Sequence, residues 1–324
     1  MAESITWDFG EMLAKESARN LFILKLLELA ETHKETVYIC ADGTPAGSKQ
    51  DEFRKRFPEQ FIEVGIAEPN AIGIAAGLAL SGKLPYVNAF GPFLSVRATD
   101  QIHTDMAYND VPVRVIGTHG GLTSGGGPTH YTVCDYAIMR SIPNMTMVAP
   151  ADANQCVKLI EASLTYPGPM YIRVARGEEP LVYKTDDYIY EIGKGIIARE
   201  GKDATVVGCG IGVYHGLVAA QELAREGIDV RVIDMHTIKP LDADLVVQAA
   251  RETGVIVTVE DHNVLGGLGS AVAEVVLEAG IPCKFKRLGI PDVFAELGQP
   301  EELYAYYGYD GAGVKAVIKQ LLAK

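Results

Sequence analysis

The sequence predicts an α/β protein with two three-layer domains, each a parallel sheet with helices on both faces. Strand-like and helix-like segments alternate along most of the chain, and one charged, proline-containing segment interrupts the alternation. Alternation is typical of parallel sheets, because parallel strands need a crossover connection that is usually a helix. The length of 324 residues also exceeds what one typical domain needs.

The first unit is expected to contain most of the alternating segments. Strands are predicted at 37–40, 61–66, 84–90, 111–119, 145–150 and 170–175. Helices are predicted at 11–32, 68–80, 93–108 and from Asp152, as N-cap, to Leu164. The segment 177–190, GEEPLVYKTDDYIY, is interpreted as the linker, so that the domains cover 1–185 and 186–324.

The second unit repeats the alternation on a smaller scale. Strands are predicted at 204–210, 229–235, 254–260 and 284–290, and helices at 212–226, 242–251, 268–279 and 311–322. In open parallel sheets, ligands bind at the carboxyl ends of strands. Four such ends carry polar or glycine-rich sequence: GIAE, NAFGPF, THGGLTSGGGPTH and RVARG.

Composition narrows the classes of partner. The net charge of -13 disfavours binding to nucleic acid or to an anionic membrane surface. The five cysteines are widely spaced without a CxxC pair, which favours buried, reduced thiols in a cytoplasmic protein over a zinc or redox site. The first residues, MAESITWDFGEM, lack a secretory apolar core, and the apolar run 71–80 is too short to span a bilayer.

Glu68 is the first candidate functional residue. It follows a strand and opens a helix of small residues, EPNAIGIAAGLALSG, with Pro69 in the first turn. Alone, such a glutamate is more typical of a surface residue that compensates the helix dipole. The Ala and Gly residues, however, permit close backbone packing and so predict a buried interface, where a carboxylate needs a partner.

Aromatic and imidazole side chains lie at the next strand ends. Phe90 and Phe93 are spaced i, i+3, which fits either core packing or an apolar slot for a flat ring. His119 and His130 border a glycine-rich loop at the end of another strand. The glycines fit either close approach of a ligand to the backbone or simply a flexible loop, and each histidine alone is more often structural. A metal site is less favoured, since no third ligand is spaced nearby.

The sequence GCGIG at 208–212, with Asp234 at the end of the next strand, is similar to a dinucleotide fingerprint. The third glycine is absent, because Val213 or His215 occupies its place. The run GGLGSA at 266–271 is interpreted as a helix start packed against a neighbour. The sequence contains no Walker motif, G-x-S-x-G elbow or HExxH.

Together, these motifs resemble those of a known enzyme family. IEVGIAE-x8-GLAL, the aromatic strand end, and THGGL…GPTH followed by IMRSIPNMTMVAPAD resemble the pyrimidine-binding domain of transketolases. VEDHNVLGGLGSAVAE and GIPDVFAELGQPEEL resemble the family's C-terminal domain. The resemblance spans nearly the whole chain and implies a thiamine-diphosphate-dependent transferase. It is strongest to the small transketolases that are split into two chains.

The resemblance implies roles for residues at the cofactor. The residue matching Glu68 hydrogen-bonds the pyrimidine ring nitrogen, and the imino tautomer that results removes the thiazolium C2 proton to give the ylid. Phe93, with Phe90 beside it, matches the aromatic residue that stacks on the pyrimidine. Arg97 completes the expected cofactor-binding set.

The resemblance also implies substrate ligands. His119 and His130 match catalytic histidines that contact the hydroxyl groups of the donor sugar. Arg176 matches the arginine that binds the distal phosphate of the acceptor, and Ser48 and Lys15 fall near the other two phosphate ligands. Lys15 stands where the family usually has an arginine, and so lacks bidentate geometry.

A partner chain is implied by what the sequence lacks. The family holds Mg²⁺ and the cofactor diphosphate with a G-D-G…N motif, and no G-D-G occurs here. An N-terminal diphosphate-binding subunit is therefore expected to supply both, in a heterotetramer with two copies of each chain. The helix at 68–80 is expected at its two-fold interface, and the complex to transfer a two-carbon ketol unit from a ketose phosphate or sulfonate to an aldose.

One departure concerns the donor. Where the family's loop reads G-E-D-G, this chain reads Ser124-Gly125-Gly126-Gly127-Pro128 and is one residue shorter. In the family the aspartate recognises a donor hydroxyl, so its loss should relax or redirect donor choice. The expected preference is for an unusual donor or acceptor, such as a sulfonated ketose, apulose phosphate or another branched sugar. The alternatives are a 2-oxo-acid dehydrogenase beta subunit, a deoxyxylulose-phosphate-synthase-like subunit, or a partner subunit without catalysis.

Overall fold

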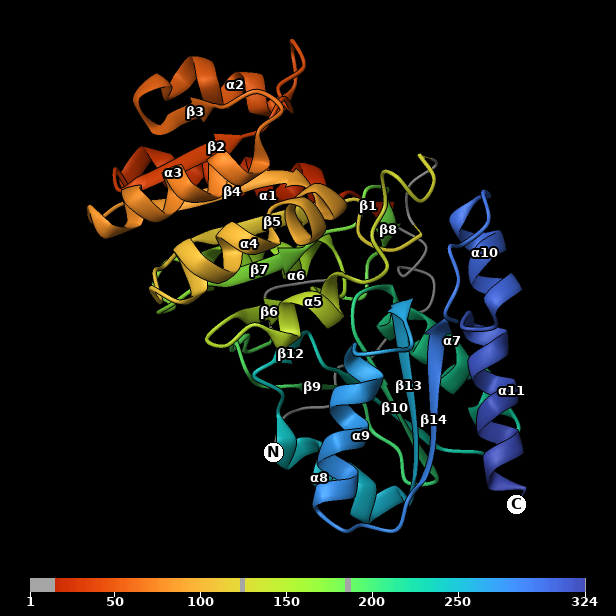
Figure 1. The fold of residues 1–324 in the computed structure, drawn as a ribbon. Coiled ribbons are helices and arrows are strands. Elements are labelled where there is room, and N and C mark those ends of the chain that lie inside the picture. The colour runs from red at the N-terminus through yellow and green to blue at the C-terminus, as the bar shows by residue number, and fades with distance from the viewer. Residues whose placement is uncertain (1–14, 123–125, 184–187, 324) are drawn as a thin grey trace.

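The larger sheet belongs to the N-terminal lobe and has seven strands in the order β12-β6-β7-β5-β4-β2-β3 (Figure 1). The computed structural model describes residues 15–122, 126–183 and 188–323. Neighbouring strands are parallel, except that β12 runs antiparallel to β6. The strands of this sheet are β2 (Thr36–Cys40), β3 (Phe61–Glu63), β4 (Leu84–Phe90), β5 (Arg114–Thr118), β6 (Thr146–Val148), β7 (Met170–Arg173) and β12 (Thr237–Lys239).

Helices cover both faces of this sheet. On one face Phe22 and Leu26 share a core with Ile160, and on the other Ile72 packs in a core with Leu94. The helices are α1 (Ala18–Thr32), α2 (Lys49–Arg56), α3 (Glu68–Leu80), α4 (Thr99–Gln101), α5 (Asp135–Ser141) and α6 (Ala153–Ser163), with a 3₁₀ turn at Pro58–Gln60 and π-helical turns at Phe93–Arg97 and Ile102–Ala107.

The C-terminal lobe contains a five-stranded sheet in the order β14-β13-β10-β11-β9, which is parallel apart from β9. Its strands are β9 (Ile196–Arg199), β10 (Ala204–Gly208), β11 (Val230–Asp234), β13 (Val255–Asn263) and β14 (Lys284–Ile290). Its helices are α7 (Ile211–Arg225), α8 (Ala243–Thr253), α9 (Leu268–Glu278), α10 (Pro300–Tyr307) and α11 (Gly311–Leu322). The predicted fold class is confirmed in both lobes.

The lobes are joined by more than the chain connection between them. β12 follows β11 in sequence but completes the sheet of the N-terminal lobe, so one sheet takes strands from both halves of the chain. In a small antiparallel ribbon, β1 (Lys15–Glu16) pairs with β8 (Glu179–Pro180). β8 lies inside the segment predicted as linker. Residues 184–187 of that segment lie outside the described residues.

Local sequence explains the elements that were predicted well. α3 begins at Glu68 with Pro69 in its first turn, and Asp152 caps α6 by accepting a hydrogen bond from the Gln155 N–H at 2.7 Å. The segment predicted as one helix at 93–108 instead consists of π-helical turns around the short α4. Such turns insert extra residues into a helix and often occur at functional sites.

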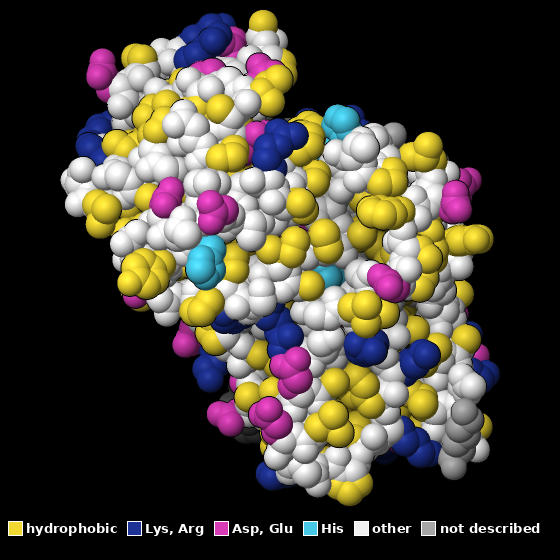
Figure 2. Space-filling model, viewed as in Figure 1, with side chains coloured by type: hydrophobic (Ala, Val, Ile, Leu, Met, Phe, Trp, Pro, Cys, Tyr) yellow, Lys and Arg dark blue, Asp and Glu magenta, His cyan; other side chains and the backbone are white. Residues whose placement is uncertain are grey.

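The surface has no single basic area on the face shown in Figure 2, where basic side chains lie among acidic ones. Among the described residues, no helix is both long and apolar enough to cross a bilayer.

All five cysteines are free, but Cys134 is exposed, contrary to the expectation that all of the thiols are buried.

The GCGIG segment serves packing between a strand and a helix. A Cβ on Gly212 would lie 2.3 Å from the carbonyl oxygen of Val259, so only glycine lets α7 approach β13 this closely. Asp234 is buried, and its Oδ2 accepts hydrogen bonds from Gln155 Nε2 at 2.6 Å and from the Tyr183 hydroxyl at 2.7 Å. Asp234 therefore ties β11 to the N-terminal lobe.

Asp234 should make the stability of the fold depend on pH. Burial raises the pKa of this carboxyl to about 7, whereas an aspartate in an unfolded chain titrates near about 3.9. A raised folded-state pKa favours the protonated form, so its contribution is complete below about pH 4 and is lost as the pH rises towards about 7, by at most about 1.4 kcal/mol per pH unit.

We therefore expect Asp234→Asn, which mimics the protonated side chain, to become more stable relative to wild type as the pH rises between about 4 and 7. Above that range the difference should stay constant. Thermal unfolding measured across a pH series tests this, and an unchanging difference between the two proteins at every pH would contradict it.

Candidate active site

A cavity of about 360 Å³ lies at the carboxyl ends of β2 and β4. It contains four of the residues predicted from sequence, Ser48, Glu68, Phe90 and Phe93. The remaining lining residues are Arg19, Ala41, Asp42, Gly43, Pro45, Gln50, Ile66, Asn88, Ala89 and Thr118. This combination of polar, aromatic and aliphatic groups suits a flat, partly polar ligand.

Glu68 is almost fully buried, with 2% of its surface exposed. Its Oε2 accepts a hydrogen bond from Arg97 Nη1 at 2.8 Å, and Arg97 reaches it from the π-helical turn that follows β4. Arg97 is itself 46% exposed, so the ion pair joins a buried anion to a solvated cation. The expected partner of the buried carboxylate is therefore Arg97.

The aromatic residues form one contiguous group with the histidines. The rings of Phe90 and Phe93 are stacked, with centroids 5.6 Å apart and planes at 17°. His119 packs against Phe90 with ring centroids 3.7 Å apart, and His130 presents its edge to Phe93 at 5.8 Å. The guanidinium of Arg97 lies 4.4 Å from the centre of the Phe93 ring.

His119 is buried and His130 is exposed, and neither is among the residues that line the cavity. Burial, together with the positive charges of Arg176 and Arg19, lowers the pKa of His119 to about 3. The His119 imidazole is therefore neutral at ordinary pH, and its Nδ1 lies 3.1 Å from the hydroxyl of Thr118. This arrangement provides a neutral hydrogen-bonding group beside the cavity, with arginine side chains near it.

Lys15 does not line the cavity. Its ammonium forms an ion pair with Glu301 of α10 at 3.2 Å, and its backbone pairs with β8. The predicted helix at 11–32 begins only at Ala18 in the structure, so Lys15 precedes the helix. Residues 11–14 lie outside the described residues.

Arg19, four residues after Lys15, lines the cavity but was not predicted from the sequence. It lines the cavity with Ser48, and its Nε is buried without a hydrogen-bond partner among the described residues. A buried, unpaired guanidinium nitrogen is costly unless a ligand engages it. The signal in the sequence was its residue type, because arginine binds phosphate in a bidentate manner.

Ser48 and Arg176 are placed differently from each other. Ser48 lines the cavity and caps α2, where its Oγ accepts a hydrogen bond from the Asp51 N–H at 3.2 Å. Arg176 is exposed beyond the end of β7 and is close enough to influence His119 electrostatically. Of the loop predicted to set donor choice, Ser124 and Gly125 lie outside the described residues.

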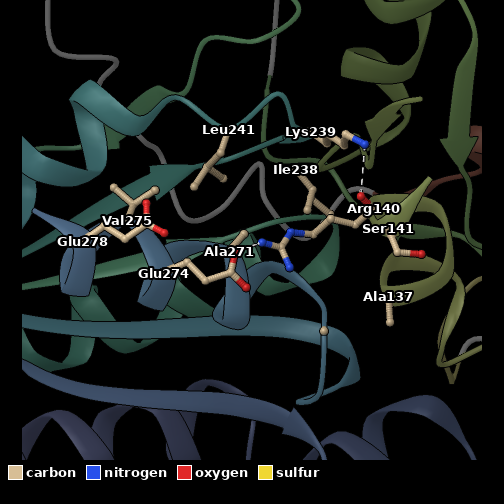
Figure 3. Close-up of a pocket in the computed structure, with 11 residues that line it drawn as sticks. Ala137, Arg140, Ser141, Ile238, Lys239, Leu241, Ala271, Glu274, Val275 and Glu278 are labelled. Atoms are coloured by element: carbon tan, nitrogen blue, oxygen red, sulfur yellow. Dashed lines mark hydrogen bonds and ion pairs between the residues drawn. The ribbon is translucent and has the colours of Figure 1, made fainter. Parts of the chain in front are cut away.

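A second hollow, of about 550 Å³, lies between α5, β12 and α9 and contains none of the predicted residues (Figure 3). Its two cations are already engaged: Arg140 forms an ion pair with Glu274, and Lys239 donates to the carbonyl oxygen of Arg140 at 3.1 Å. The cavity around Glu68 is therefore the better candidate. Within the described ranges, no group of three acidic, histidine or cysteine side chains is arranged to hold a metal ion.

Two family models match the chain in order. The model described as "Transketolase, pyrimidine binding domain" matches residues 15–180, and "Transketolase, C-terminal domain" matches residues 193–314. A solved structure described as "Split gene transketolase, inactive beta4 tetramer" superimposes with a TM-score of 0.86 at 37% identity, covering 96% of this chain and 99% of that one.

Curated relatives agree with the family models. The chain is 40% identical over 299 residues to one subunit of the apulose-4-phosphate transketolase of Phocaeicola vulgatus, covering 92% of this chain and 95% of that protein. It is 39% identical over 319 residues to "1-deoxy-D-xylulose-5-phosphate synthase" of Syntrophotalea carbinolica, covering 97% of this chain but 50% of that protein. With both domains matched and a relative of similar length at this identity, the chain belongs to the transketolase family.

Proposed function

We propose that this chain is the C-terminal subunit of a two-chain transketolase, which transfers a two-carbon ketol unit from a ketose to an aldose with thiamine diphosphate. The observation that carries the proposal is the cavity at the strand ends. It places the buried carboxylate of Glu68 beside the stacked pair of Phe90 and Phe93.

The cavity fits the aminopyrimidine end of this cofactor. Its volume of about 360 Å³ and its aromatic wall suit a flat ring. Glu68 is desolvated, and Arg97 engages only its Oε2, so the other oxygen can share a proton with a ring nitrogen. When bound, thiamine diphosphate supplies the carbon nucleophile and the electron sink that protein side chains lack.

The histidines are placed to handle the donor sugar. His119 is held by Phe90 and by the hydroxyl of Thr118, and its low pKa keeps it neutral, so it acts as a hydrogen-bonding partner of hydroxyl groups. His130 stands at the rim of the same aromatic group. Both are proposed as catalytic residues that position the donor by hydrogen bonds to its hydroxyl groups.

The cationic side of the site is proposed to bind the terminal phosphate or sulfonate of the substrates. Arg19 and Ser48 line the cavity, and Arg176 lies close enough to act on His119. Arginine offers the planar pair of donors that such anions accept. Arg19 replaces Lys15 in this assignment, because Lys15 is paired with Glu301.

A second chain is required for activity in this proposal. The sequence has no G-D-G motif to hold Mg²⁺ and the cofactor diphosphate. A relative of similar length is named as one subunit of a transketolase, and a similar split-gene chain is described as inactive in a beta4 tetramer. An N-terminal diphosphate-binding subunit is proposed to bring both groups, in a heterotetramer of two copies of each chain.

The proposed two-fold interface is the outer face of α3. Gly73 and Gly77 leave this face flat, and the neighbouring side chains of Ile66 and Leu80 are exposed. Small residues allow close approach of a second chain, and exposed apolar side chains beside them gain from burial. This surface adjoins Glu68, so the partner would close the cavity.

The donor is proposed to differ from the standard pentose phosphate. The segment 124–128 lacks the family's acidic residue, and one relative is named for apulose 4-phosphate. A site that has lost a hydroxyl-binding carboxylate should discriminate less against donors that differ at that hydroxyl. Rates with xylulose 5-phosphate and ribose 5-phosphate equal to those of ordinary transketolases would contradict this part.

A second candidate is a subunit related to deoxyxylulose-phosphate synthase. It is favoured by the 39% identity to half of one such enzyme. The two candidates differ in their donor, a ketose in one case and pyruvate in the other. Product masses from the co-purified complex, incubated with each donor in turn, separate them.

Glu68→Gln should abolish most of the turnover of the complex. The amide keeps the shape of the side chain but cannot hold the shared proton, so we expect a loss on the order of 10² to 10⁴-fold in kcat. Steady-state rates are measured with the partner chain, thiamine diphosphate and Mg²⁺, and Glu59→Gln on an exposed turn is the matched control. Turnover by this chain without a partner, or a Glu68→Gln complex at the wild-type rate, would contradict the proposal.

Arg19→Gln should raise the KM for a phosphorylated acceptor. Loss of a charged hydrogen bond predicts roughly a tenfold increase in KM for ribose 5-phosphate, with little change for glycolaldehyde, which has no phosphate. Lys15→Gln is the matched control, because its ammonium is paired outside the cavity. The opposite order, with Lys15→Gln impaired and Arg19→Gln normal, would restore the assignment made from sequence.

A further inference from the structure

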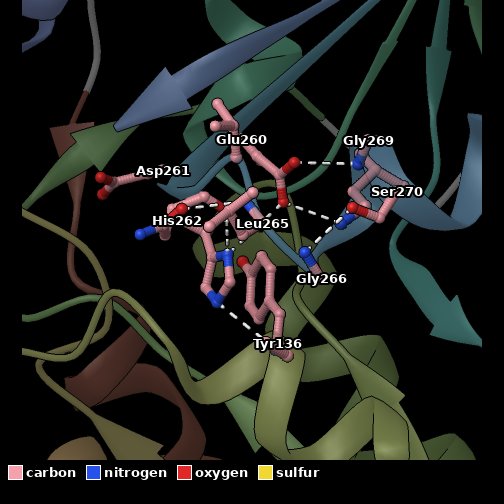
Figure 4. A network of polar contacts seen from close by, with 12 residues as sticks. Tyr136, Glu260, Asp261, His262, Leu265, Gly266, Gly269 and Ser270 are labelled. Atoms are coloured by element: carbon pink, nitrogen blue, oxygen red, sulfur yellow. Dashed lines mark hydrogen bonds and ion pairs between the residues drawn. The ribbon is translucent and has the colours of Figure 1, made fainter. Parts of the chain in front are cut away.

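Asp261 lies where the two lobes meet, at the carboxyl end of β13. β13 pairs with β10 only as far as Val259. The run of Glu260, Asp261 and His262 therefore extends beyond the end of β10 (Figure 4). All three side chains are buried, and Glu260 and Asp261 point to different sides of the strand. The chemistry proposed above assigns no part to them.

The carboxylate of Asp261 reaches into the N-terminal lobe. Both of its oxygens lie 3.1 Å from the backbone N–H of Leu122, and Oδ1 also accepts a hydrogen bond from the Tyr309 hydroxyl at 2.8 Å. Gly121 has a φ of +71°, and a Cβ at this position would lie 1.8 Å from Asp261 Oδ2. The loop therefore needs glycine at 121 in order to meet this protein carboxylate.

Arg173, at the end of β7, holds the same contact from the other side. Its Nη2 donates to the carbonyl oxygen of Asp261 at 2.6 Å, and its Nη1 donates to the Tyr136 hydroxyl at 2.6 Å. A Cβ on Gly120 would lie 2.2 Å from Arg173 Nε. The first two glycines after His119 thus accommodate protein side chains from both lobes.

These contacts lie next to both catalytic histidines. Leu122 is three residues after His119, and Thr132 is two residues after His130. Thr132 joins the two limbs of the loop, because its N–H donates to the His119 carbonyl at 3.2 Å and its carbonyl accepts from the Gly121 N–H at 2.8 Å. A shift of Leu122 is therefore expected to shift the backbone of His119 as well, because Thr132 is hydrogen-bonded to both limbs of the loop.

The second limb has its own contact with the C-terminal lobe. The hydroxyl of Tyr131 donates to the carbonyl oxygen of Ala295 at 2.9 Å. The Asn263 N–H donates to the Val133 carbonyl at 2.8 Å, so β13 also binds the chain just after the loop. Each side of the loop is thus hydrogen-bonded to the C-terminal lobe.

We propose that Asp261 is a positioning residue, with which the C-terminal lobe fixes the base of the 119–132 loop so that His119 stays packed on Phe90 and His130 on Phe93. Its catalytic consequence rests on the function proposed above. The role requires an acceptor, since Leu122 and Tyr309 both present donors. An amide keeps one oxygen for these donors but puts its NH₂ group where the second carboxylate oxygen faces the Leu122 N–H, so the contact with Leu122 is weakened.

Glu260 provides a matched control on the same strand. Its Oε2 accepts from the Leu268 N–H at 2.7 Å and its Oε1 from the Gly269 N–H at 2.9 Å, so it caps α9 within the C-terminal lobe. Asp261 and Glu260 are thus adjacent buried carboxylates that each bind backbone amides. Only the first binds the histidine loop.

Hydrogen–deuterium exchange on the full chain tests the structural part without any assay of activity. Asp261→Asn should increase exchange within 119–133 by on the order of tenfold, because the acceptor of the Leu122 amide is weakened. Glu260→Gln should increase exchange at 266–270 and leave 119–133 unchanged. Wild-type exchange of 119–133 in Asp261→Asn, or the same response to both substitutions, would overturn the proposal.

Kinetics of the co-purified two-chain complex test the catalytic part. Three ketose donors are compared first, xylulose 5-phosphate, a sulfonated ketose and apulose 4-phosphate, each with ribose 5-phosphate as acceptor. With the donor on which the wild-type complex is most active, Asp261→Asn should raise the donor KM or lower kcat by on the order of ten- to a hundredfold, since a displaced loop misplaces the histidines. Glu260→Gln should retain both parameters while lowering the unfolding temperature. A loosened loop in Asp261→Asn with wild-type kinetics would also overturn the proposal.

Tyr309→Phe is the milder variant. It removes one donor from Asp261 and retains the Leu122 contact, so we expect changes of the same kind and smaller size even where Asp261→Asn fails to fold. If Tyr309→Phe left both exchange and kinetics unaltered, the proposal would be wrong. A wild-type complex inactive with all three donors would instead contradict the proposed function, and the exchange measurement alone would then test the contact between Asp261 and the loop.

Discussion

The buried carboxylate of Glu68 is the constraint around which the N-terminal lobe is arranged. A carboxylate with 2% of its surface exposed needs hydrogen-bond donors in place of water, and Arg97 supplies one at 2.8 Å. Arg97 can do so because the chain after β4 forms π-helical turns, which bring its guanidinium over Phe93. The ion pair and the aromatic wall are therefore two results of one local backbone geometry.

Much of the fold followed from pattern, since long periodic segments leave little ambiguity. The bounds of α3 and the cap at Asp152 agree with the prediction, because helix starts depend on residue types within a few positions. β12 is only three residues long and α2 is strongly polar, so neither has an apolar period to detect. α2 depends instead on its Ser48 cap and on ion pairs around Asp51.

The site residues at strand ends could be predicted from the sequence. The residue near the start of α1 could not, because its position depends on where the helix begins. Glu68, Phe90 and Phe93 meet because parallel strands end at one edge of the sheet. Choosing between Lys15 and Arg19 required the true start of α1, which periodicity does not locate to within one turn. The glycines at 120 and 121 were expected to approach a ligand, but they meet Arg173 and Asp261, which are distant in sequence.

The position of β12 has a consequence for dividing this chain. β12 pairs with β6 along Met147 and Val148, and both of those side chains are buried. A fragment ending at the boundary between the halves would leave β6 as an edge strand, with unpaired backbone donors and acceptors beside an apolar surface. Such edges recruit other strands and lead to aggregation. The N-terminal lobe therefore depends for its solubility on β12, which comes from the second half of the chain.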